Sequence, residues 1–193
     1  MKDNKLNVIT LKDSIIVEFI FIIISLSVAF FYRHESILRF LISGGSQSRQ
    51  VINGFLIGLG IDLALFFVLY LKRSAIMALS HLRLLTKSSY FSLLLTGVIA
   101  GIGEELLFRG VLQSFIGIWI TSLIFMFAHA QFWAVPPISK GKMAFAVFAF
   151  LCGVLLGYVY IIFGLLCAII IHAMIDSFAF VYLKILFQAF PEQ

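Results

Sequence analysis

Near-continuous apolar runs, each close to 20 residues long, recur along almost the whole chain and constrain its fold more than any other feature. About 20 apolar residues is the length that a helix needs to cross roughly 30 Å of hydrocarbon. Hydrophobic residues make up 62% of the 193 positions and charged residues only 12%, whereas soluble domains carry about 25% charged residues. A chain of this size has too little interior to hide so much apolar surface from water. The sequence therefore predicts a membrane protein.

Six apolar runs qualify as candidate spans and predict an all-α, polytopic membrane protein with about six transmembrane helices. They are residues 14–32, 51–71, 90–117, 118–133, 143–163 and 165–187. The third run is over-long, the fourth is short, and no polar linker separates them, so we expect a tight helical hairpin near Gly117. We expect residues 1–88 to form two N-terminal transmembrane helices with an amphipathic connector, and residues 89–193 to form a separate membrane core.

The basic residues predict the orientation of these spans. With six crossings, one side holds Lys2, Lys5, Lys12, Lys72, Arg73, Arg83, Lys87, Lys140, Lys142 and Lys184, and the other holds Arg33, Arg39 and Arg49. Because an excess of Lys and Arg marks the cytoplasmic side, we expect a multi-pass protein of the cell membrane with both termini in the cytoplasm. The basic residues form short clusters without a continuous stripe, which argues against a nucleic-acid partner. Cys152 and Cys167 lie inside apolar runs and do not indicate a disulfide scaffold.

Ionisable residues inside the apolar runs are the candidate functional residues, because a charge at mid-membrane is costly and usually faces the interior of a helix bundle. Two of them, Glu18 and Asp62, stand alone in the first two runs. The others lie in the second half of the chain: Glu104, Glu105, Arg109, His129, His172 and Asp176.

The densest cluster is GEELLFRG, residues 103–110. On a helix, Glu105 and Arg109 are four residues apart and can pair on one face, while Glu104 points about 100° away. One carboxylate can thus be neutralised while its neighbour stays free to react. The alternative is a structural salt-bridge cluster in which both carboxylates and Arg109 hold helices together.

Two further runs each contribute a histidine. His129 follows Phe125 by one helical turn, and His172 and Asp176 point from one helix face. A lone buried histidine is usually a satisfied core residue, but depth argues for cooperation here. Counted from Gly117 at about 1.5 Å per residue, Glu104 lies roughly 20 Å deep and His129 roughly 17 Å. Counted from Gly164, His172 and Asp176 lie about 12 and 18 Å deep, so we expect all four in one layer.

A carboxylate and an imidazole that converge on one water form a general-base pair, and a second imidazole beside a short polar side chain can stabilise an oxyanion. This chemistry hydrolyses acyl groups. The chain has no G-x-S-x-G nucleophile motif, so activated water is the simpler interpretation, and we expect no cofactor. Zinc held by Glu104, His129 and His172 is the alternative, although an H-E-x-x-H helix is absent and Arg109 disfavours a cation unless Glu105 neutralises it.

Three motifs in this order, E-E-x-x-x-R at 104–109, F-x-x-x-H at 125–129 and H-x-x-x-D at 172–176, resemble the CPBP family over residues 90–187. This family contains the type II CAAX prenyl endopeptidases and the bacterial Abi proteins, which process bacteriocins or confer immunity to them. The resemblance implies a conical four-helix catalytic core and an intramembrane endopeptidase, often described as a metalloprotease. It implies that Glu104 and His129 activate water, that His172 and Asp176 stabilise the oxyanion, and that Glu105, Arg109 and Phe125 orient the site.

One residue departs from the pattern, because the prenyl endopeptidases typically carry Asn where this chain has Asp176. An ionised Asp cannot donate a hydrogen bond to an oxyanion, so Asp176 is protonated, orients His172 or serves a different substrate. The alternative function is a non-catalytic bacteriocin-immunity or regulatory membrane protein on the same scaffold. We expect a peptide or membrane-protein substrate and the lipid bilayer as partners. The sequence identifies neither the substrate nor the oligomeric state.

Overall fold

The computed structural model describes residues 11–32, 34, 36, 40, 44–71, 87–129 and 140–189, and every regular element within these ranges is a helix. The elements are α1 (Leu11–Ser27), the π-helical η1 (Val28–Tyr32), α3 (Gln47–Leu71), α5 (Tyr90–Glu105), the π-helical η3 (Leu106–Leu112), α6 (Gln113–Ala128), α7 (Lys140–Phe163) and α8 (Leu165–Ala189). The predicted all-α class is confirmed. Most of the predicted amphipathic connector, residues 72–86, lies outside the described residues.

Five helical runs are long and apolar enough to cross a membrane: Asp13–Tyr32, Gln47–Leu71, Tyr90–Ala128, Lys142–Phe163 and Leu165–Ala189. The prediction of about six is therefore close, and it differs in one place. The expected third and fourth spans follow one another without a linker in a helical run of 39 residues, which is interrupted at Gly117. Its described second arm ends at Ala128, so it rises only roughly 17 Å beyond Gly117, too little to cross the hydrocarbon.

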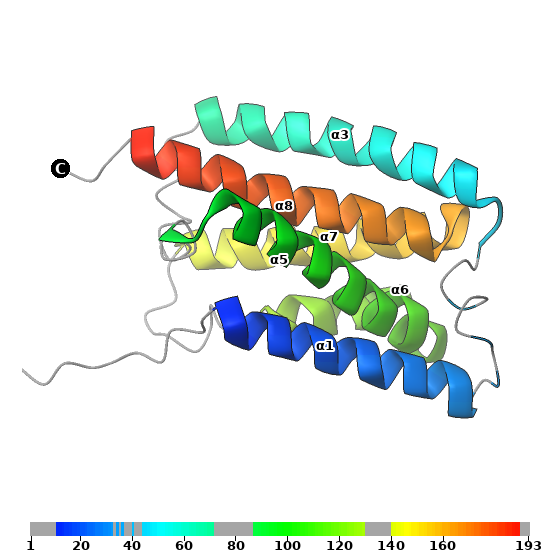
Figure 1. Ribbon diagram of the computed structural model, residues 1–193. Coiled ribbons are helices and arrows are strands. Elements are labelled where there is room, and N and C mark those ends of the chain that lie inside the picture. Colours follow the sequence, from blue (N-terminus) through cyan, green and yellow to red (C-terminus); the bar gives the residue numbers. More distant parts are fainter. Residues whose placement is uncertain are drawn as a thin grey trace, which may run out of the picture.

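Gly117 is where this long run reverses. Its backbone dihedrals, φ 77° and ψ 172°, are not helical, and only glycine adopts them without strain. Figure 1 shows α6 returning beside the end of α5. The predicted hairpin near Gly117 is confirmed. A second glycine with positive φ, Gly164 (φ 110°), separates α7 from α8 in the same way.

The helices form a bundle in which α5 lies between α1 and α8 (Figure 1). Helix α3 packs on α8 and α6 packs on α7. The start of α1 and the end of α8 lie at the same end of the bundle (Figure 1). This arrangement agrees with termini on one side of the membrane, whereas their cytoplasmic location stays a prediction.

Small residues on α5 allow both neighbours to approach closely. A Cβ atom at Gly101 would lie 2.6 Å from the backbone nitrogen of Ala173 on α8, and one at Gly97 would collide with Ser177. Gly103 faces the opposite neighbour, because a Cβ there would lie 2.9 Å from the backbone oxygen of Glu18 on α1. These contacts, which recur in membrane helix packing, bring α1 and α8 against the segment that carries the two adjacent glutamates.

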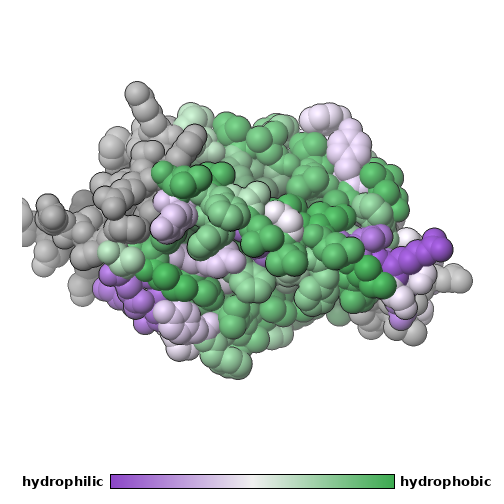
Figure 2. Space-filling model, turned by 90° about the horizontal axis from the view of Figure 1, so that it is seen from above, coloured by the Kyte–Doolittle hydropathy of each residue, from purple (hydrophilic) through white to green (hydrophobic). Residues whose placement is uncertain are grey.

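The outer surface of the bundle is apolar. Large side chains such as Phe31, Leu71 and Phe91 are each 73% exposed. Figure 2 shows hydrophobic side chains over the middle of one face and strongly hydrophilic ones gathered towards its two ends. A surface of this kind is stable against lipid tails rather than water. The chain is a multi-pass membrane protein.

Candidate active site

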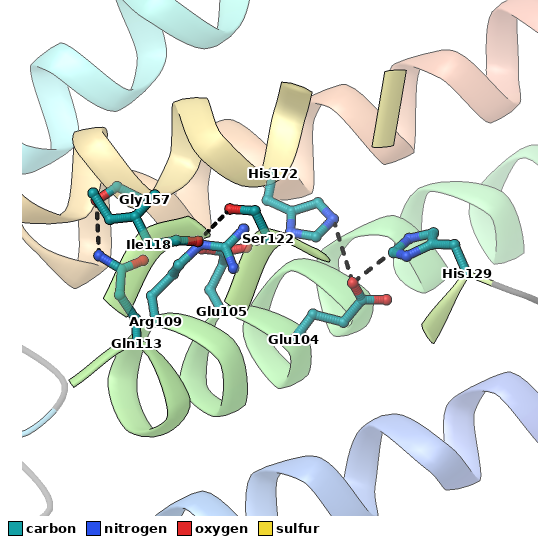
Figure 3. Close-up of polar contacts among 9 residues, drawn as sticks. All are labelled: Glu104, Glu105, Arg109, Gln113, Ile118, Ser122, His129, Gly157 and His172. Atoms are coloured by element: carbon teal, nitrogen blue, oxygen red, sulfur yellow. Dashed lines mark hydrogen bonds and ion pairs between the residues drawn. The ribbon is translucent and has the colours of Figure 1, made fainter. Parts of the chain in front are cut away.

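Three helical segments meet at the carboxylate of Glu104, which lies in the last turn of α5. Its Oε2 atom lies 3.7 Å from Nε2 of His129, at the end of α6, and 3.9 Å from Nε2 of His172 on α8 (Figure 3). Both separations exceed a direct hydrogen bond, and polar atoms at such distances commonly share a water molecule. The structure thus brings together the glutamate and both membrane histidines in one layer, as the depth count predicted.

Glu105 projects from α5 in a different direction from Glu104 and is fully buried. Its Oε2 lies 3.3 Å from Nε of Arg109, whose side chain also has no exposed surface. Its Oε1 lies 2.8 Å from Nδ1 of His172. The two adjacent glutamates therefore differ in surroundings: Glu105 is paired with the guanidinium of Arg109, while Glu104 faces the two imidazoles and its own side chain is 13% exposed. This is the division between a neutralised and a free carboxylate that the spacing predicted.

The tautomers of both histidines follow from their Nδ1 partners. Nδ1 of His129 lies 2.8 Å from the backbone oxygen of Phe125, and a carbonyl oxygen only accepts hydrogen bonds. Nδ1 of His172 lies against the carboxylate of Glu105. Nδ1 therefore carries the proton in each ring, and Nε2 of each ring is left to act towards Glu104. An Nδ1–H bond to a carboxylate also stabilises the protonated imidazole, as in catalytic triads.

Phe125 fixes these rings by packing. Its ring lies 4.5 Å from that of His129 and 5.7 Å, edge-on, from that of His172. The guanidinium carbon of Arg109 lies 4.9 Å from its centroid, within the range of a cation–π interaction. Phe125 is itself only 2% exposed. One aromatic side chain thus contacts three of the predicted site residues.

Asp176 lies at the edge of the cluster, one turn beyond His172 on α8. Its Oδ2 lies 3.6 Å from Nε2 of His172, and its side chain is 27% exposed. Together with the partly exposed His129 and Glu104, it marks the side of the cluster that opens outwards, since Glu105 and Arg109 are sealed inside. The structure thus places every predicted site residue in one connected cluster.

Two features of this region were missed by the sequence analysis. The segment from Leu106 to Leu112 is a π-helix, an element that is often found at functional sites and that has no simple sequence signature. Glu18 is isolated in the sequence but not in space, because it lies against Gly103, directly before Glu104. The other isolated acid, Asp62, is buried on α3, and neither of its oxygens has a hydrogen-bond partner within the described residues.

Glu104, His129 and His172 are the ligands of the alternative zinc site. No group of three or more His, Cys, Asp or Glu side chains that could hold a metal ion is found in the described part of the chain. Turnover with and without a chelator tests the zinc alternative. Cys152 and Cys167 are free thiols, and Cys167 is fully buried in the core.

Comparison with protein families gives one match. Residues 86–178 match the model of the family described as type II CAAX prenyl endopeptidase Rce1-like. No match was found among curated proteins or solved structures. The matched range contains all three motifs of the cluster, from Glu104 to Asp176, and the family is one of membrane proteases. Residues 86–178 of this chain are therefore similar to the Rce1-like type II CAAX prenyl endopeptidases, and this match agrees with the family that the sequence motifs predicted.

Proposed function

We propose that this chain is an intramembrane endopeptidase in which Glu104 and His129 activate a water molecule that hydrolyses the substrate peptide bond. The observation that supports this most strongly is the position of the Glu104 carboxylate, which faces Nε2 of both His129 and His172 at 3.7 and 3.9 Å. A carboxylate without an Arg or Lys partner among the described residues, beside the imidazole of His129 with a free Nε2 lone pair, is a suitable general base for water.

In the proposed reaction, water donates hydrogen bonds to Glu104 and to Nε2 of His129. Glu104 takes one proton as the water oxygen attacks the carbonyl carbon, which gives a tetrahedral intermediate with a negatively charged oxygen. Protonated His172 donates from Nε2 to this oxyanion while Nδ1 stays bonded to Glu105. Glu104 then passes its proton to the departing amine, the carbon–nitrogen bond breaks, and the carbonyl group re-forms as a carboxylic acid.

Glu105, Arg109 and Phe125 act on this reaction through His172 and His129. Glu105 accepts a hydrogen bond from Nδ1–H of His172, and Arg109 balances the charge of Glu105. The Phe125 ring and backbone oxygen hold the plane of His129. None of these three groups needs to touch the substrate. We assign them to orientation of the reacting groups, in line with their complete or near-complete burial.

Asp176 acts on His172 in this proposal. Its Oδ2 approaches Nε2 of His172, so an ionised Asp176 favours the protonated imidazole that the oxyanion requires. The family's usual Asn contributes a hydrogen-bond donor that can act on the oxyanion directly, so the two residues support the same intermediate by different means.

The test is cleavage of quenched fluorescent peptides by the purified protein in proteoliposomes. The library contains matched prenylated and unprenylated peptides, so that the same assay assigns the substrate class. Wild-type protein is compared with His129→Ala and with Ser25→Ala, a control on α1 whose buried hydroxyl donates a hydrogen bond to the carbonyl oxygen of Phe21 in its own helix. We expect cleavage by the wild type and the control and its loss in His129→Ala. Absence of turnover in all three proteins across both peptide sets contradicts the proposal and favours the immunity or regulatory scaffold.

A further inference from the structure

Glu18 is a buried acid that the proposed reaction does not use. It lies in α1, outside the segment matched by the family model, and is 7% exposed. A Cβ atom on Gly103 would collide with its Oε2 and lie 3.1 Å from its Cβ. The glycine therefore creates the space in which the Glu18 carboxyl reaches α5, beside the residue that carries the reactive carboxylate. Glu18 and Glu104 are close enough for their carboxyl groups to interact, and Oε2 of each is buried without a hydrogen-bond partner within the described residues.

The charges around Glu18 and Glu104 require that one of these two carboxyl groups carries a proton. Glu105, Arg109 and His172 form a buried chain of contacts of their own. His129 from α6 and His172 from α8 approach Glu104, and Asp176 adds a further negative charge on α8. Within the described residues Glu18 itself has no ion-pair partner. Two adjoining carboxylates in a site of low dielectric cannot both be ionised, so one of them holds a proton.

We propose that Glu18 is a positioning residue that keeps its proton and donates it in a hydrogen bond to Glu104, so that the Glu104 carboxylate stays directed at His129 and His172. Glu18 is the member that holds the proton because both imidazoles approach Glu104. The consequence for catalysis rests on the function proposed above, whereas the hydrogen bond from Glu18 to Glu104 does not depend on that function.

Two substitutions of Glu18 and one of Gly103 distinguish a neutral hydrogen-bond donor at position 18 from a charged or merely space-filling residue. Glu18→Gln keeps the length and a hydrogen-bond donor, so it should retain kcat within about threefold. Glu18→Leu removes the donor and should lower kcat about 10- to 100-fold with KM nearly unchanged, since hydrogen bonds to charged groups are among the stronger ones. Gly103→Ala leaves Glu18 in the sequence but displaces its carboxyl and should reproduce the loss of kcat. Ser25→Ala is the matched control for a buried polar residue on α1.

Infrared spectroscopy tests the proton without any peptidase activity. The wild-type protein in liposomes should show the carbonyl stretching band of a protonated carboxylic acid, and Glu18→Gln should lose part of it. Asp62→Asn removes the other buried acid of the N-terminal helices, and the change in this variant gives the part of the band that comes from Asp62. The part of the band that is lost in Glu18→Gln is then assigned to Glu18. This result is expected even if no peptide is cleaved, which keeps failure of this proposal distinct from failure of the proposed function.

Three outcomes overturn the proposal. The first is a Glu18→Gln variant that is folded but as inactive as Glu18→Leu, because an ionised Glu18 is then required. The second is a Glu18→Gln variant whose protonated-carboxyl band equals that of the wild type. The third, measured once the wild type shows turnover, is a Glu18→Leu variant with unchanged kcat.

Discussion

The Glu105–Arg109 pair gives the most quantitative prediction, because neither side chain has any exposed surface. At the observed 3.3 Å between Nε and Oε2, and with an effective dielectric of about 20, the attraction is about 5 kcal/mol. Arg109→Met removes the cation but keeps an unbranched chain against Phe125. The Glu105 carboxylate is then buried without its charge partner, and we expect the free energy of unfolding to fall by about 3–5 kcal/mol.

The companion variant is Glu105→Gln combined with Arg109→Met. It leaves no buried charge from the pair, while the amide oxygen of Gln still accepts a hydrogen bond from Nδ1 of His172. We expect most of the lost stability to return, with a coupling energy of about 2 kcal/mol or more between the two sites. Unfolding in mixed detergent micelles, applied to the wild type, both single variants and the double variant, measures this cycle. Additive losses, or an Arg109→Met variant within about 1 kcal/mol of wild type, would refute the reasoning.

Three further outcomes are expected. Asp176→Asn should retain turnover within about tenfold, since the amide supplies a donor where the carboxylate supplies charge; complete loss in the peptide assay would contradict the role given to Asp176. Gly101→Val should prevent α5 from reaching Ala173 and lower stability by about 2 kcal/mol or more, which thermal unfolding in detergent measures; an unchanged melting temperature would contradict the packing. Asp62→Asn should raise stability, or at least not lower it, because it replaces an unpartnered buried carboxyl with a neutral amide; a clear loss would mean that Asp62 has a stabilising partner.

Most of the fold could be predicted because lipid imposes a simple length rule. Predicted and observed spans agree within four residues at each end for the first, second, fifth and sixth runs. Residues 118–133 differ, because their described helix ends at Ala128. Apolar composition indicates that a segment avoids water but not how far it crosses the bilayer, and the short α6 exposes large apolar side chains such as Trp119 and Phe127 on the outer surface of the bundle. Gly117 nevertheless indicated the reversal, because a residue with positive φ between two helices is nearly always glycine.

The convergence of the cluster could be predicted from helical rise alone. Counting from Gly117 and Gly164 placed Glu104, His129 and His172 at similar depth, and the observed contacts agree. The roles given to these residues stay predictions until activity is measured.

The contact of Glu18 with α5 could not be predicted by the same count, because neither a motif nor a family pattern indicates that α1 packs against α5. The sequence signal that could have found it is the small residue Gly103, which permits α1 to approach directly before Glu104. The π-helical geometry of η3 could likewise not be predicted, because a count along a regular helix assumes 3.6 residues per turn throughout.

The most direct test of the account is the turnover of Glu104→Gln beside wild type, each with and without a strong chelator, on a peptide that the wild-type protein cleaves. Gln fills the same space but cannot take a proton from water. We predict that wild-type cleavage survives chelation and that kcat of the folded variant falls at least about 10³-fold, within the range known for general-base residues. A variant within tenfold of wild type, or wild-type activity that disappears with the chelator and returns with added zinc, would contradict the assignment of Glu104 as the base that activates water.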